Sequence, residues 1–189
     1  VGFLSLGWIC GGGRCFYTKK PVHSVKDLAN LKIRVMENKV YIDMVNLLGA
    51  KAVPMAYGEV YSALQTGVLD GAENDFGAYY TQKHYEVAPY YAVDMHTIDI
   101  TGLLVSTKTW NKLSNADKQI LIETLPAFVE EGRRAWAELT IDARKSLEKL
   151  DVTITEVDQE EFKKAVKPLW DESLKVLGRE FFDFVMATP

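Results

Sequence analysis

The sequence predicts an α/β fold with a mostly parallel β-sheet and helices on both of its faces. Strand-like and helix-like segments alternate through the first hundred of the 189 residues, which is typical of a parallel sheet. Hydrophobic residues make up 48% of the chain and charged residues 25%, the composition of an ordinary globular protein with a substantial core. A long helical segment in the second half adds a helix that reaches beyond a single sheet layer.

The predicted strands and helices of the first hundred residues are short. Ser24 can cap a short helix, and Gly49 and Gly67 lie where glycine commonly ends one. Leu31–Val35 alternates apolar and polar residues, as a half-buried strand does. We expect strands at 3–9, 14–18, 31–35 and 51–54, with a glycine loop at 11–13, and helices at 24–29, 40–48 and 59–66. Residues 69–74 are expected to form a short strand or a turn that leads into another helix.

The second half is predicted to be mostly helical. Ser114 caps a helical region that runs from 115 to 150 and carries an apolar stripe. Pro126 lies inside this region, and because proline removes one backbone hydrogen bond, we expect a kink near Thr124. The remaining predicted elements are strands at 100–106 and 152–157, and helices at 158–177 and 180–186.

The sequence carries few signals of catalysis. Its three histidines lie far apart without metal-ligand neighbours at helical spacing, and no nucleophile motif of the Gly-x-Ser-x-Gly type occurs. The triple glycine at 11–13 can present backbone N–H groups to an anion or form a hairpin turn, but it is not a P-loop. Cys10 and Cys15 form either a disulfide or two free apolar side chains. We therefore expect no enzyme, no cofactor and no metal site.

Charge and hydropathy argue against nucleic-acid binding and against direct insertion into a membrane. The formal net charge is −4, whereas a nucleic-acid-binding protein carries a basic face. No apolar run reaches the roughly 18 residues of a membrane-spanning helix. No signal peptide is visible, and the chain opens at Val1 in an apolar run. We expect that an N-terminal part is missing from this sequence and that apolar patches are exposed as a result.

Arg34 is the residue whose chemistry is most specific. It lies near the C-terminal end of a predicted strand, beside the crevice in which open α/β sheets bind ligands. Because a guanidinium is permanently charged, it needs an anion or full hydration, and its planar fork matches a carboxylate. An internal ion pair with Glu59, Glu73 or Asp43 is equally compatible with the sequence.

Glu73 and Asn74 follow the same logic. They end a short predicted strand, beyond Gly71, which permits a tight approach of the backbone. An asparagine donates and accepts hydrogen bonds, which suits a carboxylate or a hydroxyl group. A helix N-cap by Asn74 or Asp75 is at least as compatible with the local sequence.

Several segments form an ordered series of family motifs. The most diagnostic run extends from Gly58 to Gly67 (GEVYSALQTG), and Leu69–Asn74 (LDGAEN) follows it. The other members of the series are Gly13-Arg14 with Phe16 and 19–21, then 24–28, 31–38, 48–50, Pro54-Met55, Trp110 and the helix after Ser114. Together they resemble the DctP-like solute-binding proteins of TRAP (tripartite ATP-independent periplasmic) transporters over essentially the whole chain.

The resemblance implies a periplasmic-binding-protein-like fold of the Venus flytrap, type II-like class, in which two lobes close on a ligand. By analogy, residues 12–99 and 140–189 form the C-terminal ligand-binding lobe. Residues 1–11 and 100–139 belong to the N-terminal lobe, the hinge and a long kinked interdomain helix. Most of that N-terminal lobe is expected upstream of this sequence.

The resemblance also implies a ligand site. Arg34 matches the family's carboxylate-binding arginine, Arg14 a second arginine and Asn74 the cleft asparagine. In some family members a proline follows the Glu-Asn pair, whereas in this sequence the next residue is Asp75. The shape of the pocket at that point is therefore not implied by the resemblance. The other residues expected to contact the ligand are Tyr57, Glu37, Glu73, Phe76 and Trp8.

The function implied is that of an extracytoplasmic, periplasmic solute-binding protein that captures a small organic acid. Its partners are that acid and the integral-membrane subunits of a TRAP transporter, driven by an ion gradient. Aromatic and acidic residues near the site favour a sugar acid over a C4-dicarboxylate. A ligand-sensing regulatory module of the same fold and an α/β enzyme are the alternatives.

Overall fold

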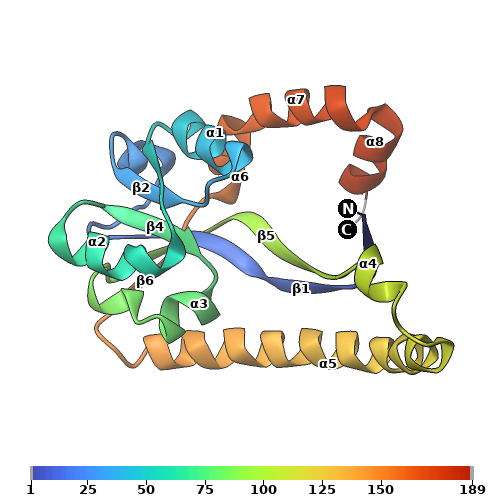
Figure 1. Ribbon diagram of the computed structural model, residues 1–189. Helices are drawn as coiled ribbons and strands as arrows, with labels where there is room; N and C mark the ends of the chain where they lie inside the picture. The colour runs from blue at the N-terminus through green and yellow to red at the C-terminus, as the bar shows by residue number, and fades with distance from the viewer. Residues whose placement is uncertain (1, 188–189) are drawn as a thin grey trace.

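The centre of the molecule is a six-stranded mixed sheet, seen in a computed structural model that describes residues 2–187 (Figure 1). The strand order is β3-β2-β4-β1-β5-β6. Its strands are β1 (Phe3–Thr18), β2 (Lys32–Val35), β3 (Lys51–Pro54), β4 (Gly71–Asn74), β5 (Tyr90–Ser106) and β6 (Thr153–Glu156). Only β1 is antiparallel to its neighbours, so the other five strands run in one direction. The predicted mostly parallel sheet is confirmed.

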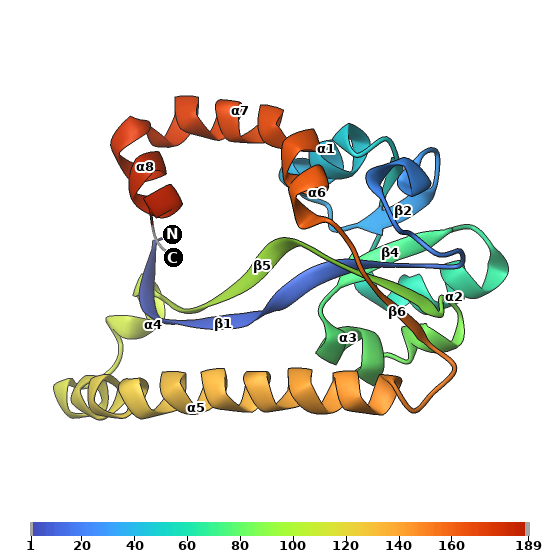
Figure 2. The same ribbon diagram turned by 180° about the vertical axis from the view of Figure 1, so that it is seen from behind.

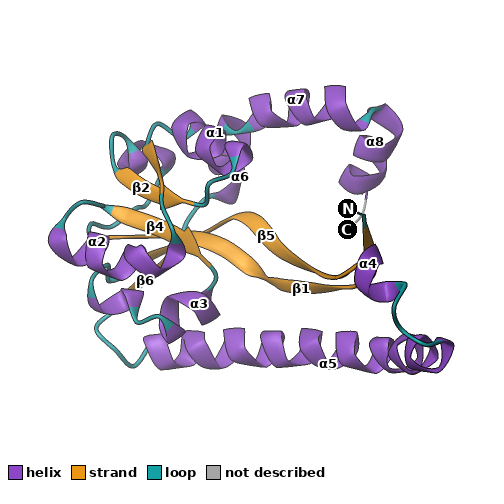
Figure 3. Cartoon of the chain, in the orientation of Figure 1, coloured by secondary structure: helices purple, strands orange, loops and turns teal. Residues whose placement is uncertain are grey.

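Helices cover both faces of this sheet (Figure 3). One face is covered by α1 (Lys39–Leu47), α6 (Gln159–Ala165) and α7 (Lys167–Leu177), and the other by α2 (Val60–Thr66), α3 (Phe76–Thr81) and α5 (Asn115–Leu147). The remaining helices are α4 (Thr107–Trp110), α8 (Arg179–Ala187) and the single 3₁₀ turns Val25–Leu28, Tyr57–Glu59 and His84–Glu86. Within residues 2–187, none of these helices combines the length and the apolarity needed to cross a bilayer.

The glycine segment near the N-terminus differs from the prediction. Two strands joined by a glycine loop were expected, but β1 is continuous, and the pairing shifts register between Cys10 and Gly13. A Cβ atom on Gly11 would lie 3.0 Å from the Cβ of Asp99, and one on Gly12 would lie 3.0 Å from the Cβ of Asp75. The glycines therefore make room for neighbouring side chains instead of forming a turn. Cys10 is exposed and Cys15 is buried, and both are free thiols.

The long helix α5 holds Pro126 within 33 residues of continuous helix. Its first turns are seen almost end-on in Figure 1, whereas the rest lies across the view, so the helix bends in its first third, as expected for Pro126. The single helix predicted at 158–177 is instead divided at Val166 into α6 and α7. Pro168 then falls in the first turn of α7, where a missing N–H is tolerated.

Strand register sorts the side chains near the predicted site onto two faces. Arg34 pairs with Ala72, Ala72 with Tyr17, and Tyr17 with Tyr91 across β2, β4, β1 and β5. Since side chains alternate along a strand, these residues face the α2, α3 and α5 layer, and so does Asn74. Glu73, one residue earlier, faces the α1 and α6 layer.

The outer halves of β1 and β5 form a two-stranded ribbon above α5 (Figure 2). Its apolar side chains are exposed: Phe3 by 65%, Trp8 by 52% and Ile100 by 63%. An exposed apolar surface was expected from the sequence. The assignment of this ribbon to a second lobe stays a prediction.

Candidate ligand-binding site

Arg34 is a buried cation without a carboxylate partner among residues 2–187. The residue is 4% exposed, and its Nε donates to the carbonyl of Met55 at 2.9 Å. Its two terminal nitrogens donate to no group in the described chain and keep contact with solvent. Burial lowers the pKa of Arg34, while the charge of the more distant Glu73 opposes that shift. The planar end of this guanidinium is therefore free to bind an anion.

The internal ion pairs considered for Arg34 do not form. Glu73 binds Arg14, and Asp43 pairs with Lys39 on α1. Glu59 is exposed at the end of its 3₁₀ turn and makes no ion pair within the described residues. The structure thus removes the alternative that the sequence left open.

Tyr57 supplies a wall and a hydroxyl group beside Arg34. Its ring centroid lies 5.4 Å from the Arg34 guanidinium carbon, within cation–π range. Its hydroxyl is buried and makes no close hydrogen bond within residues 2–187, and the Asn74 side chain is a polar neighbour of it. Burial raises the pKa of the Tyr57 phenol, so the group stays neutral and can still donate or accept a hydrogen bond.

Asn74 ends β4 with an unused donor. Its Oδ1 accepts from the backbone N–H of Asp75 at 3.0 Å, and its carbonyl accepts from the Tyr91 hydroxyl at 2.9 Å. Asp75 caps α3 by accepting from the N–H of Ala78 at 2.9 Å, so Asn74 is not the cap. The side-chain amide of Asn74 lies near enough to the Tyr57 hydroxyl to lower the pKa of that phenol, but the two groups make no close hydrogen bond. Arg34, Tyr57 and Asn74, here called the carboxylate site, all retain unused polar groups.

Arg14 is buried on the other face of the sheet and is already paired. Its Nε and Nη2 donate to the two carboxylate oxygens of Glu73 at 2.6 and 2.9 Å. Its Nη1 lies 3.3 Å from Oδ2 of Asp99, and its guanidinium lies 5.6 Å from the Tyr41 ring centroid. Arg14 also affects the pKa of Arg34, so the two guanidiniums lie within electrostatic range of each other.

His96 links Glu73 to a second buried carboxylate. Its Nδ1 lies 2.7 Å from Oδ2 of Asp94, and its Nε2 lies 3.4 Å from Oε2 of Glu73. Burial alone would lower the pKa of His96, but Asp94 and Glu73 raise it to about 9. The imidazole is therefore charged at neutral pH. Arg14, Glu73, Asp94 and His96, here called the charge cluster, balance two positive charges with two negative ones.

The remaining predicted site residues lie in different surroundings. Glu37 is exposed in the segment after β2. Phe76 is 6% exposed and stacks on Tyr91 at 4.2 Å, so it belongs to the core. Trp8 lies on the exposed ribbon, in a groove that it shares with Trp110. The structure thus brings Arg34, Tyr57 and Asn74 together, joins Arg14 to Glu73, and leaves Trp8 apart from them.

Asp94, His96 and Asp99 were missed at the sequence level. The first half of β5, from Tyr90, was not predicted as a strand. If it had been, the spacing of Asp94 and His96 by two residues would have placed both on one face. That alternation was the available signal.

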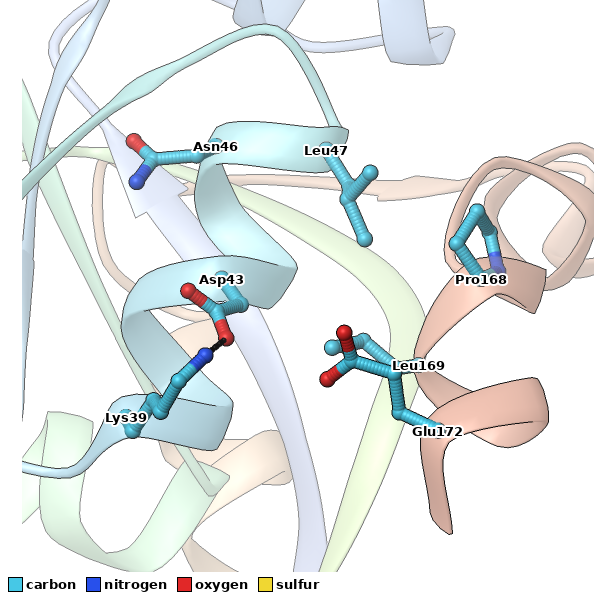
Figure 4. A pocket seen from close by; sticks show the side chains of 7 residues that line it. All are labelled: Lys39, Asp43, Asn46, Leu47, Pro168, Leu169 and Glu172. Atoms are coloured by element: carbon cyan, nitrogen blue, oxygen red, sulfur yellow. Dashed lines mark hydrogen bonds and ion pairs between the residues drawn. The ribbon is translucent and has the colours of Figure 1, made fainter. Parts of the chain in front are cut away.

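The surface groove in Figure 4 lies away from the carboxylate site. It has a volume of about 390 Å³ between α1 and α7, and Lys39 and Asp43 form an ion pair on one of its walls. Its other lining residues are Asn46, Leu47, Pro168, Leu169 and Glu172. A smaller cavity of about 150 Å³ borders Tyr41, His96 and Trp170. Neither space contains Arg34, Tyr57 or Asn74.

Known proteins share this sequence and fold. Residues 1–176 match the DctP family, described as bacterial extracellular solute-binding protein, family 7. A solute-binding protein from Chromohalobacter salexigens is 39% identical over 171 residues, which cover 89% of this chain and 51% of that protein. The chain therefore spans about half the length of such relatives.

Solved structures agree with this match. A TRAP periplasmic solute-binding protein from Roseobacter denitrificans with bound β-D-glucuronate has a TM-score of 0.93 and 32% identity, covering 100% of this chain and 64% of that one. A counterpart from a Sulfitobacter species with bound β-D-galacturonate has a TM-score of 0.88 and 33% identity, covering 93% and 59%. These proteins are binding proteins and not enzymes. This chain belongs to the DctP family of TRAP solute-binding proteins, as its ordered motifs predicted.

Proposed function

We propose that this chain binds the carboxylate of a small organic acid on Arg34. The observation that supports this most strongly is the burial of Arg34 without a carboxylate partner in residues 2–187. An uncompensated buried charge is unfavourable. An incoming carboxylate relieves that cost, and a neutral solute of the same shape does not.

The recognition uses three groups of the carboxylate site. The terminal nitrogens of Arg34 form a planar fork that donates two parallel hydrogen bonds to one carboxylate. The free N–H₂ of Asn74 is a further donor on the same face of the sheet. The ring of Tyr57 packs against the carbon skeleton, and its unpartnered hydroxyl bonds to the ligand.

A sugar acid fits this arrangement better than a C4-dicarboxylate. Arg14 is neutralised by Glu73, so the carboxylate site offers one free cation and not two. The two solved relatives named above hold uronates, which are sugar acids with a single carboxylate. Both features support a hydroxylated monoacid as ligand.

The full protein works outside the cytoplasm, in the periplasm, and delivers its ligand to the membrane subunits of a TRAP transporter. Residues 12–99 and 140–189 form the ligand-binding lobe, of which residues 188–189 lie outside the part of the chain that the structure describes. The exposed ribbon with α5 leads to the second lobe. Closure of the two lobes on the acid shifts the protein toward the form that its membrane partner recognises. The family match and the exposed apolar ribbon support this role.

A thermal-shift screen of the full-length protein tests the proposal. D-glucuronate and D-galacturonate should raise the Tm by several degrees, since a ligand at 100 times its Kd stabilises a protein by about 2.7 kcal/mol. D-glucose has the same carbon skeleton as D-glucuronate without the carboxylate, and it should give no shift. A flat Tm with every organic acid tested would show that the chain is not an acid-binding protein.

A further inference from the structure

Asp99 lies at the edge of the charge cluster, on the part of β5 that leaves the core of the sheet. Its Oδ2 is 3.3 Å from Nη1 of Arg14, longer than the roughly 2.7–2.9 Å of a strong charge-assisted hydrogen bond. Its side chain is 33% exposed, whereas that of Glu73 is fully buried. Gly11 packs against it, and a Cβ atom there would lie 3.0 Å from the Cβ of Asp99. The Asp99 carboxylate therefore has one long contact to Arg14, and the lack of a side chain on Gly11 leaves space for it.

The charge cluster does not need Asp99. Arg14 is bound through two nitrogens by Glu73, and His96 is bound by Asp94, so the four charges already cancel. Within residues 2–187, the Asp99 side chain makes no hydrogen bond other than the long contact to Arg14. One of its oxygens therefore has no donor from the described chain. Asp99 adds a negative charge and a free acceptor beside Arg14, which precedes Cys15, the residue paired with Asn74 at the end of β4.

The charges around Arg34 and around Arg14 favour different chemical groups at the two ends of a ligand. Arg34 is the free cation and takes a carboxylate. Arg14 cannot bind a second carboxylate in the same way, because its Nε and Nη2 are bound by Glu73 and its Nη1 lies beside Asp99. A second carboxylate that approached Arg14 would meet the negative charge of Asp99, whereas a hydroxyl group would find an acceptor there.

We propose that Asp99 is a specificity-determining residue that accepts a ligand hydroxyl and repels a second carboxylate, so that the site selects hydroxylated monoacids over diacids. The inference rests on the proposed function, because it needs one carboxylate held by Arg34. It extends that function by naming the group that rejects diacids.

Calorimetric titration of the full-length protein with two matched acids tests this inference. D-glucuronate carries one carboxylate, and D-glucarate carries a second one at the other end of the same six-carbon skeleton. The parent protein should prefer glucuronate, and added salt should narrow that preference because Asp99 is partly exposed. In Asp99→Asn, which keeps an acceptor for Arg14 but loses the charge, the ratio of the two Kd values should move toward glucarate by on the order of 10- to 100-fold.

A matched control removes the same charge elsewhere. Asp43 lies on α1, and Lys39 is its ion-pair partner within the described residues, so Asp43→Asn should keep the parental ratio. A parent that binds glucarate as tightly as glucuronate contradicts the role of Asp99, and so does an Asp99→Asn ratio within threefold of the parental one. If the parent binds neither acid, the proposed function itself fails together with this inference. If it binds glucuronate and the ratio does not move, only the role of Asp99 is overturned.

Discussion

Replacing Arg34 by alanine should abolish most of the affinity for an acid while leaving the fold intact. At an effective dielectric constant of about 20, two unit charges about 4 Å apart attract by about 4 kcal/mol. Truncating one partner of a buried charge pair costs about 2–5 kcal/mol. Since about 1.4 kcal/mol corresponds to a factor of ten, Kd should rise roughly 30- to 4,000-fold.

The fold should tolerate this replacement because Arg34 makes little use of its guanidinium within the protein. Its one hydrogen bond in the described chain runs from Nε to Met55, and losing such a bond costs about 1 kcal/mol. Removing a buried charge without a carboxylate partner offsets part of that cost. A urea titration should therefore show a midpoint close to that of the parent.

Calorimetric titration of D-glucuronate into the parent and into Arg34→Ala measures the effect. Arg134→Ala is the matched control, since the Arg134 side chain is 58% exposed and, among residues 2–187, forms ion pairs only with Glu131 and Glu138 on α5. The control should bind as the parent does. If Arg34→Ala bound glucuronate with the parental Kd, the assignment of Arg34 to the ligand would be wrong.

Three further predictions follow from the same structure. Tyr57→Phe removes a buried hydroxyl that makes no close hydrogen bond within residues 2–187, so the urea midpoint should stay level or rise. The Kd for glucuronate should increase about 3- to 10-fold. An unchanged Kd would show that the hydroxyl does not contact the ligand. The pKa of His96 is raised to about 9 from an ordinary 6.5, so its charged form stabilises the fold fully below pH 6.5 and that contribution is lost as the pH rises through 9. The free energy of unfolding should fall by on the order of 1–3 kcal/mol between pH 6 and 9.5 in the parent and by less in His96→Gln, and equal losses in both would contradict the raised pKa. In Gly71→Ala the new Cβ would lie 2.6 Å from Cγ2 of Thr18 and 2.7 Å from the carbonyl oxygen of Tyr17. We therefore expect the free energy of unfolding, measured by urea titration, to fall by about 1–3 kcal/mol. A parental midpoint would show that the strands shift to accommodate the methyl group.

Local sequence signals predicted the helix ends that are set by a capping residue or a terminal glycine. The glycines after α1 and α2 end those helices, and Ser114 caps α5 by accepting from the N–H of Asp117. Both glycines adopt positive φ angles, 85° at Gly49 and 78° at Gly67, which suit glycine. Short-range chemistry of this kind can be read without knowing the fold.

Strand register is decided by residues that are far apart, and it sets the roles of the two arginines. Arg14 and Glu73 are 59 positions apart and meet because β1 runs antiparallel to β4. The same register turns Glu73 and Asn74, neighbours in sequence, to opposite faces of the sheet. The sequence placed both residues near the ligand, but it contained no signal that Glu73 would be bound by Arg14.

The continuous course of β1 was also hidden from local patterns. A triple glycine normally favours a loop, and here it serves close packing against Asp75 and Asp99. The first half of β5 escaped prediction because its buried face holds Asp94 and the charged His96 in place of apolar residues. Buried charges that are paired through tertiary contacts break the hydrophobic alternation on which strand prediction depends.

A crystal structure of the full-length protein with bound D-glucuronate tests the central claim most directly. Both carboxylate oxygens should lie about 2.7–2.9 Å from the two terminal nitrogens of Arg34, with the Asn74 N–H₂ in hydrogen-bond range. The ion pair between Arg14 and Glu73 should persist in that structure. A carboxylate bound elsewhere, with the terminal nitrogens of Arg34 still facing only solvent, would contradict the account.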